Sequence, residues 1–163
     1  MGESVIDLSE YTERTRSLEY VIKEAWLEDG NGKCSNSFEM GSSVKICYRF
    51  KSSKSIYNPG FGFGVDDMHG KRLFSANNYI MTENSTAINS AQEGIVKCTF
   101  PSVPLQPGSY FVSIAIVEDQ RVIIDYIERI MEFRIEAVDV FKSGKTFDSS
   151  QGIIFVPAKI VLE

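Results

Sequence analysis

The sequence has more negative than positive charge and contains no basic stretch. Lysine and arginine together number 17, against 22 aspartate and glutamate residues, which gives a formal net charge of -5. The longest basic cluster is the pair Lys71-Arg72. Proteins that bind nucleic acids normally present a basic patch or stripe to the phosphate backbone. We therefore expect no nucleic-acid partner for this chain.

Long apolar runs are also missing. The nearest candidate, 110–117, is far shorter than the roughly 20 residues of a membrane-spanning helix, and it is typical of a strand. The N-terminal residues lack the basic-then-apolar pattern of a secretory signal. The three cysteines, Cys34, Cys47 and Cys98, follow no tight spacing, which favours reduced thiols and a cytoplasmic location. A single Cys47–Cys98 bridge across a sandwich stays open as an alternative.

Residue sets that carry catalysis or bind metals are scarce. The single histidine, His69, precedes a glycine in a turn, and no nucleophile and base are suggested beside it. No glycine-rich phosphate loop of the Walker A type occurs, and the cysteines lack the spacing of a zinc site. The carboxylate pairs 66–67 and 118–119 could bind calcium, although solvated turns explain them as well. We expect a non-catalytic domain with no cofactor and no metal.

The most unusual stretch that is present is 59–67, where glycines alternate with aromatic and aliphatic residues. In a strand, successive side chains point to opposite faces. One face would carry Phe61, Phe63 and Val65 toward a core, and the other would carry the three intervening glycines and Asp66. A face so poor in side chains lets another backbone, a neighbouring sheet or a ligand approach closely.

From residue 18 onward the sequence is typical of an all-β domain, because alternating apolar residues are separated by turn residues. No segment predicts a convincing helix. A two-sheet antiparallel β-sandwich is predicted over 18–163, preceded by a polar connecting arm over 1–17. We predict about nine strands, near residues 18–28, 44–51, 59–66, 71–77, 94–100, 110–118, 121–127, 131–137 and 152–162.

The segment 105–110 is typical of a tyrosine corner. Pro107 and Gly108 would make the turn, and the hydroxyl of Tyr110 would bond back to nearby backbone. If Tyr110 faces the core, Phe111 and Ser113 face outward on the same strand. This gives a second strand with small outward residues to accompany the glycine-rich one, although parity does not prove that the two are neighbours.

The outward residues suit carbohydrate. Sugars present apolar C–H patches ringed by hydroxyls, so their sites combine an aromatic platform with planar polar groups. The parity of the strand that holds Trp26 is not determined by the pattern, and core packing remains the alternative for each aromatic residue. We expect glycan-binding residues on the outer face and its adjoining loops, namely Trp26, Arg49, Asp66, Asn77, Tyr79, Phe111 and Ser113.

Several motifs, taken in order, resemble a known family. They are Phe-Gly-Phe-Gly-Val-Asp-Asp over 61–67 with Gly70 and Leu73, the corner Leu105-x-Pro107-Gly108-x-Tyr110, the segments 125–127 and 133–135, and Gly-Ile-Ile-Phe-Val-Pro over 152–157. Together they resemble the C-terminal domain of Wzt, the nucleotide-binding subunit of the ABC transporter that exports O-antigen polysaccharide. The resemblance covers about residues 18 to 160.

The resemblance implies an immunoglobulin-like sandwich that binds the exported O-antigen glycan in the cytoplasm and gives the transporter its substrate specificity. It implies homodimers in which the C-terminal strand is exchanged. It also implies the transporter's ATPase domain and membrane permease as partners, at the inner face of the inner membrane. Pro157 fits an edge strand, and the loop 139–150 is long enough to act as a hinge. The resemblance assigns no glycan-contacting residue.

Two other functions remain open. A structural or protein-interaction module with an immunoglobulin-like fold would pack its bare glycine face against another protein. A carbohydrate-binding module of a secreted glycosidase would be favoured by a bound calcium ion and a Cys47–Cys98 disulfide.

Overall fold

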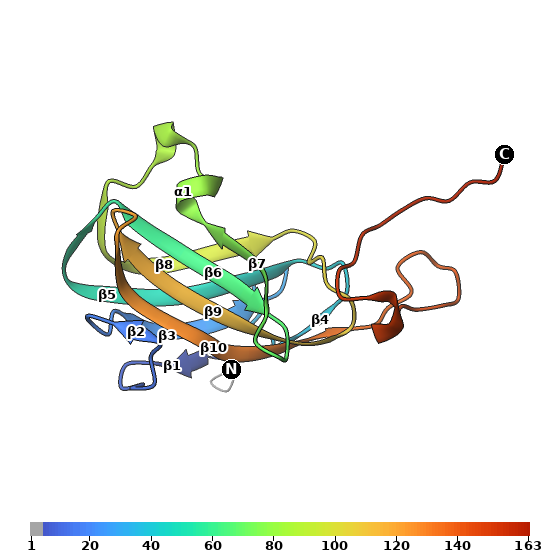
Figure 1. The fold of residues 1–163 in the computed structure, drawn as a ribbon, viewed down its shortest axis with the longest axis horizontal. Coiled ribbons are helices and arrows are strands. Elements are labelled where there is room, and N and C mark those ends of the chain that lie inside the picture. The colour runs from blue at the N-terminus through green and yellow to red at the C-terminus, as the bar shows by residue number, and fades with distance from the viewer. Residues whose placement is uncertain (1–4) are drawn as a thin grey trace.

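The computed structural model describes residues 5–163, which form two β-sheets packed face to face (Figure 1). The first sheet has the order β1 (Val5–Asp7), β3 (Ile22–Glu28), β5 (Val44–Tyr57) and β8 (Ser90–Phe100). The second has the order β2 (Arg16–Ser17), β10 (Val122–Glu136), β9 (Gly108–Glu118), β6 (Pro59–Asp66) and β7 (Arg72–Asn77). Only β4 (Ser37–Glu39), beside β10, pairs in parallel among the described strands. The predicted all-β, immunoglobulin-like sandwich is confirmed, with ten strands rather than nine in the described residues.

The apolar alternation of the sequence forms the core between the sheets. Tyr48 of β5 stacks on Phe63 of β6 with ring centroids 5.1 Å apart, and Phe50 packs on Phe61 at 5.3 Å. The Tyr48 hydroxyl donates to the carbonyl of Ala115 in β9 at 3.0 Å, which satisfies a buried polar group. Because the aromatic face of β6 is held in the core, its glycine face must point outward.

The strands β9 and β10 form the long hairpin of the second sheet. The predicted tyrosine corner is present at its start, where the Tyr110 hydroxyl donates to the carbonyl of Gln106 at 2.7 Å. The predicted strands 121–127 and 131–137 form the single strand β10, whose register shifts between Ile127 and Met131. A β-bulge of this kind bends a strand without ending its pairing.

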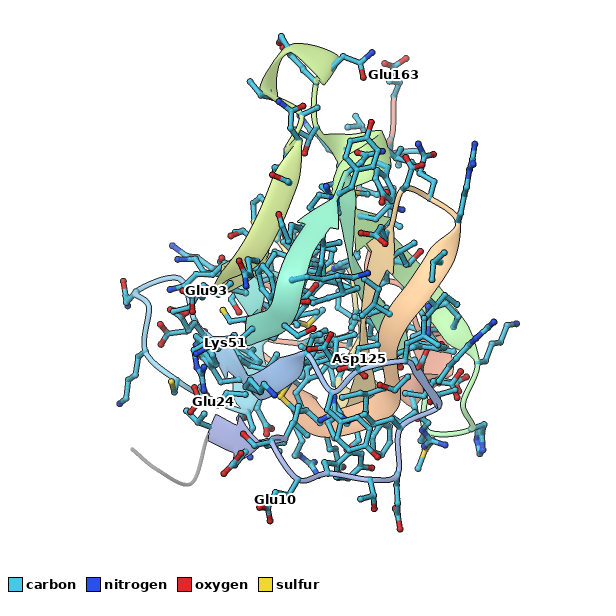
Figure 2. The ribbon with its side chains drawn as sticks, turned by 90° about the vertical axis from the view of Figure 1, so that its left-hand side faces the viewer. Glu10, Glu24, Lys51, Glu93, Asp125 and Glu163 are labelled. Carbon is cyan, nitrogen blue, oxygen red and sulfur yellow. The ribbon has the colours of Figure 1, made fainter. Side chains whose placement is uncertain are left out.

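Residues 5–17 are part of the sandwich, which corrects the predicted connecting arm. β1 pairs with β3, β2 pairs with β10, and Leu8 is fully buried. The Arg14 side chain is ion-paired with Asp125 of β10, which Figure 2 shows near the middle of the molecule. The segment is mostly polar, so hydrophobic periodicity did not reveal it. Residues 1–4 of the predicted arm lie outside the described residues.

The end of the chain does not form the strand predicted over 152–162. Ile154 makes an isolated bridge to the loop before β9, and Phe155 is buried. Beyond this point an extended tail leaves the sandwich (Figure 1), with Ile160 and Leu162 exposed to 96% and 99%. The composition favours a strand, but within residues 5–163 no neighbouring strand pairs with the tail.

Within residues 5–163, helical structure is limited to single turns, where the sequence predicted none. The helix α1 (Asn78–Met81) follows β7, and two 3-10 turns occupy 84–86 and 149–151. None of the helices in residues 5–163 has the length and apolar character needed to cross a membrane. The turn α1 matters here because it carries Tyr79 to the outer face of the second sheet.

Candidate functional site

The outer face of the second sheet has few side chains where β6 and β9 meet. The three glycines of β6 lie opposite the outward residues of β9, which are Val117, Ala115 and Ser113. The two strands that parity could not place side by side are therefore neighbours. Neither strand supplies a long side chain here, so the sheet offers a shallow floor.

Side chains from β7 and α1 cover two of the three glycines. A Cβ atom added at Gly60 would lie 2.1 Å from the Tyr79 ring, and one added at Gly64 would lie 2.4 Å from the Arg72 guanidinium carbon. At Gly62 the nearest atom would be 3.6 Å away, which is an ordinary contact distance. The bare face expected from the sequence is therefore open only at Gly62.

Together these residues enclose a groove of about 260 Å³ on the outer face. Along β6 the groove lies between Tyr79 and Arg72, and across the strands it lies between Asn77 of β7 and Tyr126 of β10. The floor is small and uncharged, while the boundary consists of two phenols, an amide and a guanidinium. These groups can pack against the C–H face of a sugar ring and hydrogen-bond to its hydroxyls.

A buried carboxylate holds one boundary of the groove in place. Asp66 is 3% exposed, is ion-paired with Arg72, and accepts a bond from the Ser113 hydroxyl at 2.7 Å. Arg72 also donates to the Tyr126 hydroxyl at 3.4 Å, and Tyr126 donates to Glu128 at 2.7 Å. Charge-assisted bonds are stronger than neutral ones, so the Arg72 guanidinium is fixed while its side chain stays 40% exposed.

Tyr79 is fixed at the opposite boundary. Its hydroxyl donates to the carbonyl of Asn58 at 2.6 Å and accepts a bond from the N–H of Gln120 at 3.1 Å. Asn77 caps α1 by accepting a bond from its backbone at 3.1 Å, which orients the turn that carries Tyr79. Burial raises the pKa of Tyr79 and of Tyr126, so both phenols are neutral near pH 7.

Comparison with known proteins assigns the family. The sequence model of the Wzt C-terminal domain matches residues 11–154. The chain belongs to that family. The crystal structure of the C-terminal domain of Wzt resembles this fold with a TM-score of 0.72 and 14% sequence identity, over 96% of each chain. No curated protein sequence matches.

The family assignment confirms the resemblance seen in the motifs. It places the chain in the context of the O-antigen ABC transporter, in a domain of the Wzt subunit distinct from its ATPase part. At 14% identity the solved Wzt domain supports the fold alone.

Five of the seven residues predicted to bind glycan lie on the second sheet or at its end. Asn77, Tyr79 and Ser113 line the groove, and Asp66 holds the Arg72 boundary. Phe111 lies farther along β9, where the Arg129 guanidinium covers its ring at 4.4 Å from the centroid. The structure therefore brings four of the predicted residues together and leaves Phe111 outside the groove.

Trp26 and Arg49 lie on the outer face of the first sheet, which corrects their assignment to the same site. Arg49 pairs with Glu24 at 3.0 Å, and the Trp26 indole donates to Glu28 at 3.2 Å. Figure 2 shows Glu24 on the left flank of the sandwich, away from Asp125 of the second sheet. Alternation tells which residues of a strand point outward, but not which of two sheets the strand joins.

The groove also depends on Arg72 and Tyr126, which are not among the residues predicted from the sequence to bind glycan. Arg72 begins the strand after the turn at 67–70, and the pairing of β6 with β7 places it opposite Asp66. That hairpin was readable in the sequence and could have identified Arg72. Tyr126 lies opposite Ala115 because of the register between β10 and β9, which alternation within one strand does not reveal.

A larger cavity of about 560 Å³ opens between the sheets at their free edges. Its lining includes the core rings of Phe50, Phe61 and Phe63, together with Ile95 and Met81, whose side chains are exposed. β8 and β7 are edge strands of their sheets. In the described residues no further strand closes the sandwich on this side.

The thiols form no disulfide. Cys98 lies opposite Ile46 and Cys47 opposite Lys97, so the two cysteines point to opposite faces of the first sheet. Burial and a hydrogen bond to Glu28 raise the pKa of the Cys47 thiol far above its usual range, and burial raises that of Cys98 to about 11. Across residues 5–163 no three His, Cys, Asp or Glu side chains are grouped as metal ligands.

Proposed function

We propose that this domain binds O-antigen glycan in the groove of the second sheet, and thereby contributes substrate specificity to the ABC transporter that exports the polymer. The observation that carries the proposal is the groove itself, with an open glycine floor bounded by fixed phenol, amide and guanidinium groups. Membership of the Wzt C-terminal domain family supports the transporter context. Binding of this kind is non-catalytic and needs no cofactor.

The geometry suggests how a sugar would lie. Its C–H face would rest on Gly62 and Ala115, and its hydroxyls would meet Asn77, Arg72 and Tyr126 at the boundary. Hydrogen bonds to a sugar replace bonds to water with a small net gain, so each contact contributes modestly. The fixed positions of the boundary groups reduce the entropy lost on binding. We therefore expect weak binding that becomes useful through repeated contacts along a polymer.

Titration with the O-polysaccharide of the parent strain tests the proposal. We expect NMR shift changes at Gly62, Ala115 and Tyr126. Gly62→Val fills the floor with a side chain that suits a strand and should weaken binding by about tenfold or more. Arg49→Gln, on the outer face of the first sheet, is the control and should bind normally. A lack of shift changes, or normal binding by Gly62→Val, would contradict the assignment of the groove.

We also propose that two copies form a homodimer by exchanging their C-terminal tails. The tail at 156–163 exposes Val156, Ile160 and Leu162, whose even spacing places them on one face of a strand. The edge strand β8 offers unpaired backbone groups, and the 560 Å³ cavity beside it offers apolar rings. An extended segment that adds to this sheet edge would pair with the backbone of β8 and place its apolar side chains against the rings of the cavity.

The contacts before the tail support a hinge after Phe155 rather than in the loop 139–150. Phe155 packs on Phe141 and Phe147 of that loop, with ring centroids 6.2 and 5.6 Å apart. The N–H of Phe155 also donates to the carbonyl of Pro104 at 2.9 Å. Because these contacts hold the loop against its own sandwich, only the residues beyond them are free to exchange.

The proposed partners beyond the glycan are the ATPase domain and the membrane permease of the transporter, at the cytoplasmic side of the inner membrane. The two alternatives have less support. Tyr79 and Arg72 cover two of the three glycines, so the glycine face is not the flat surface that a protein-interaction module would present. The opposed directions of Cys47 and Cys98 argue against the disulfide that would favour a secreted glycosidase module.

A further inference from the structure

We propose that the groove takes uncharged glycan segments and rejects anionic ones, an inference that rests on the proposed glycan-binding function and narrows its substrate class. The inference comes from the charges around the groove. The cation at its boundary is already neutralised by the protein, and the turn at the opposite end carries a net negative charge.

Arg72 is the one charged side chain among the described residues that line the groove. Its partner Asp66 has a side chain only 4% exposed, so the carboxylate cannot exchange Arg72 for water. The Ser113 hydroxyl fixes the same carboxylate at 2.7 Å. A free guanidinium recognises carboxylates and phosphates strongly, but here the charge is compensated. The N–H groups that remain exposed can still donate to neutral hydroxyls.

The charges just outside the groove come in opposite signs. Arg16 of β2 lies opposite Tyr126 in register, and Glu128 accepts the hydroxyl of the same tyrosine at 2.7 Å. Farther along β9, Arg129 covers an aromatic ring, and Glu132 lies opposite that ring in the register. Neither set leaves a net positive charge beside the groove.

At the Tyr79 end the turn 118–121 carries two carboxylates and one cation, the exposed Arg121, so its net charge is negative. Glu118 accepts a bond from the backbone N–H of Tyr57 at 2.9 Å, and Asp119 accepts one from the side chain of Asn58 at 3.1 Å. These carboxylates lie close enough to Tyr79 to add to the effect of burial on its pKa. An anionic sugar would meet repulsion here without a free cation at the boundary to offset it.

The experiment compares two forms of one polymer with the full chain. The O-polysaccharide of the parent strain is titrated as its uncharged form and as a carboxylated form made by oxidising primary hydroxyls. If the native polymer carries carboxylates, these are reduced to alcohols to make the uncharged form. We expect the uncharged form to bind about tenfold or more tightly. Its affinity should change little with salt, because no ion pair forms on binding.

Charge-removing variants separate the effect of charge from that of altered shape. Asp66→Asn leaves Arg72 uncompensated, so it should tighten binding of the carboxylated form and make that binding salt-dependent. Glu24→Gln frees Arg49 on the other sheet with the same change in net charge, and should change neither property. If Asp66→Asn fails to fold, Glu118→Gln at the opposite end should still strengthen binding of the carboxylated form by about two- to threefold.

The outcomes for the two proposals are distinct. Tighter binding of the carboxylated form by the natural chain, or no gain for that form in a folded Asp66→Asn or Glu118→Gln variant, overturns the charge inference. The glycan-binding function would survive that result, since the polymer still binds. If neither form binds, the proposed function fails and the charge inference fails with it.

Discussion

The ion pair between Arg14 and Asp125 ties the N-terminal segment to the sandwich. The two side chains are exposed to 1% and 0%. Arg14 also donates to the carbonyls of Leu8 and Tyr11, and the N–H of Ile22 donates to Asp125 at 3.0 Å. A buried charge is costly unless it is paired and hydrogen-bonded, so each partner depends on the other.

Replacing Arg14 should therefore be strongly destabilising. Arg14→Met leaves Asp125 without its partner and should lower the free energy of unfolding by about 3 kcal/mol or more. Burial raises the pKa of Asp125, so the folded state keeps this proton to higher pH than the unfolded chain does. The free energy of unfolding therefore falls as pH rises from the pKa of the unfolded chain to that of the folded state. Arg14 lowers the pKa of Asp125, so removing Arg14 raises that pKa further and widens this pH range. Urea unfolding should show a larger deficit at pH 7 than at pH 5.

Arg16→Met provides the control for this measurement. Arg16 is exposed and lies two residues from Arg14, and its replacement by methionine makes the same change in charge and size. Exposed substitutions of this kind usually change stability by about 0.5 kcal/mol or less. Equal stability of the two variants would mean that the buried pair does not hold the N-terminal segment.

Among the elements, the sequence predicts those whose pattern repeats and misses those that depend on partners. Alternation located β5, β6 and β9 and assigned their core faces, because a half-buried strand requires it. The strands β1 and β2 span only three and two residues, which is too short for a period to appear. The predicted glycan site combined residues of both sheets for a related reason. Arg49 and Asp66 both point outward, but cross-strand pairing places them on different sheets.

The glycines of β6 should respond differently to alanine. Gly60→Ala would push into the Tyr79 ring, which its hydroxyl anchors, and should cost about 1–3 kcal/mol. Gly64→Ala would push into the Arg72 guanidinium, which the buried Asp66 holds, and should cost a similar amount because displacing it weakens a buried ion pair. Gly62→Ala has free space and should be neutral or stabilising by up to about 1 kcal/mol, because alanine restricts the unfolded chain.

Urea unfolding of the three alanine variants measures this order directly. If the covering side chains determine the cost, stability should fall at positions 60 and 64 and change least at position 62. Equal losses at all three positions would instead assign the cost to the strand backbone. The glycines would then not be explained by the room they make for Tyr79 and Arg72.

Across the whole molecule, the open side of the sandwich and the unpaired tail are complementary. The sequence predicts a strand over 152–162, and the structure leaves most of that segment exposed. Strand-forming residues stabilise a sheet only through neighbours, and residues 5–163 of one chain provide none for the tail. In the proposed exchange, the edge strand of a second copy would supply the neighbour that the strand propensity of the tail requires.

Removal of the tail tests this at the level of the assembly. The full chain should be a dimer by size-exclusion chromatography with light scattering, and the chain without 156–163 should be a monomer. The free energy of unfolding of the truncated monomer should be close to that of one sandwich of the full chain, because the exposed tail buries little apolar surface within one chain. Ile160→Ser should weaken the dimer more than Val161→Ser, whose side chain would point to the opposite face of the exchanged strand. A dimer that persists after the deletion, or a full chain that stays monomeric at high micromolar concentration, would contradict the exchange.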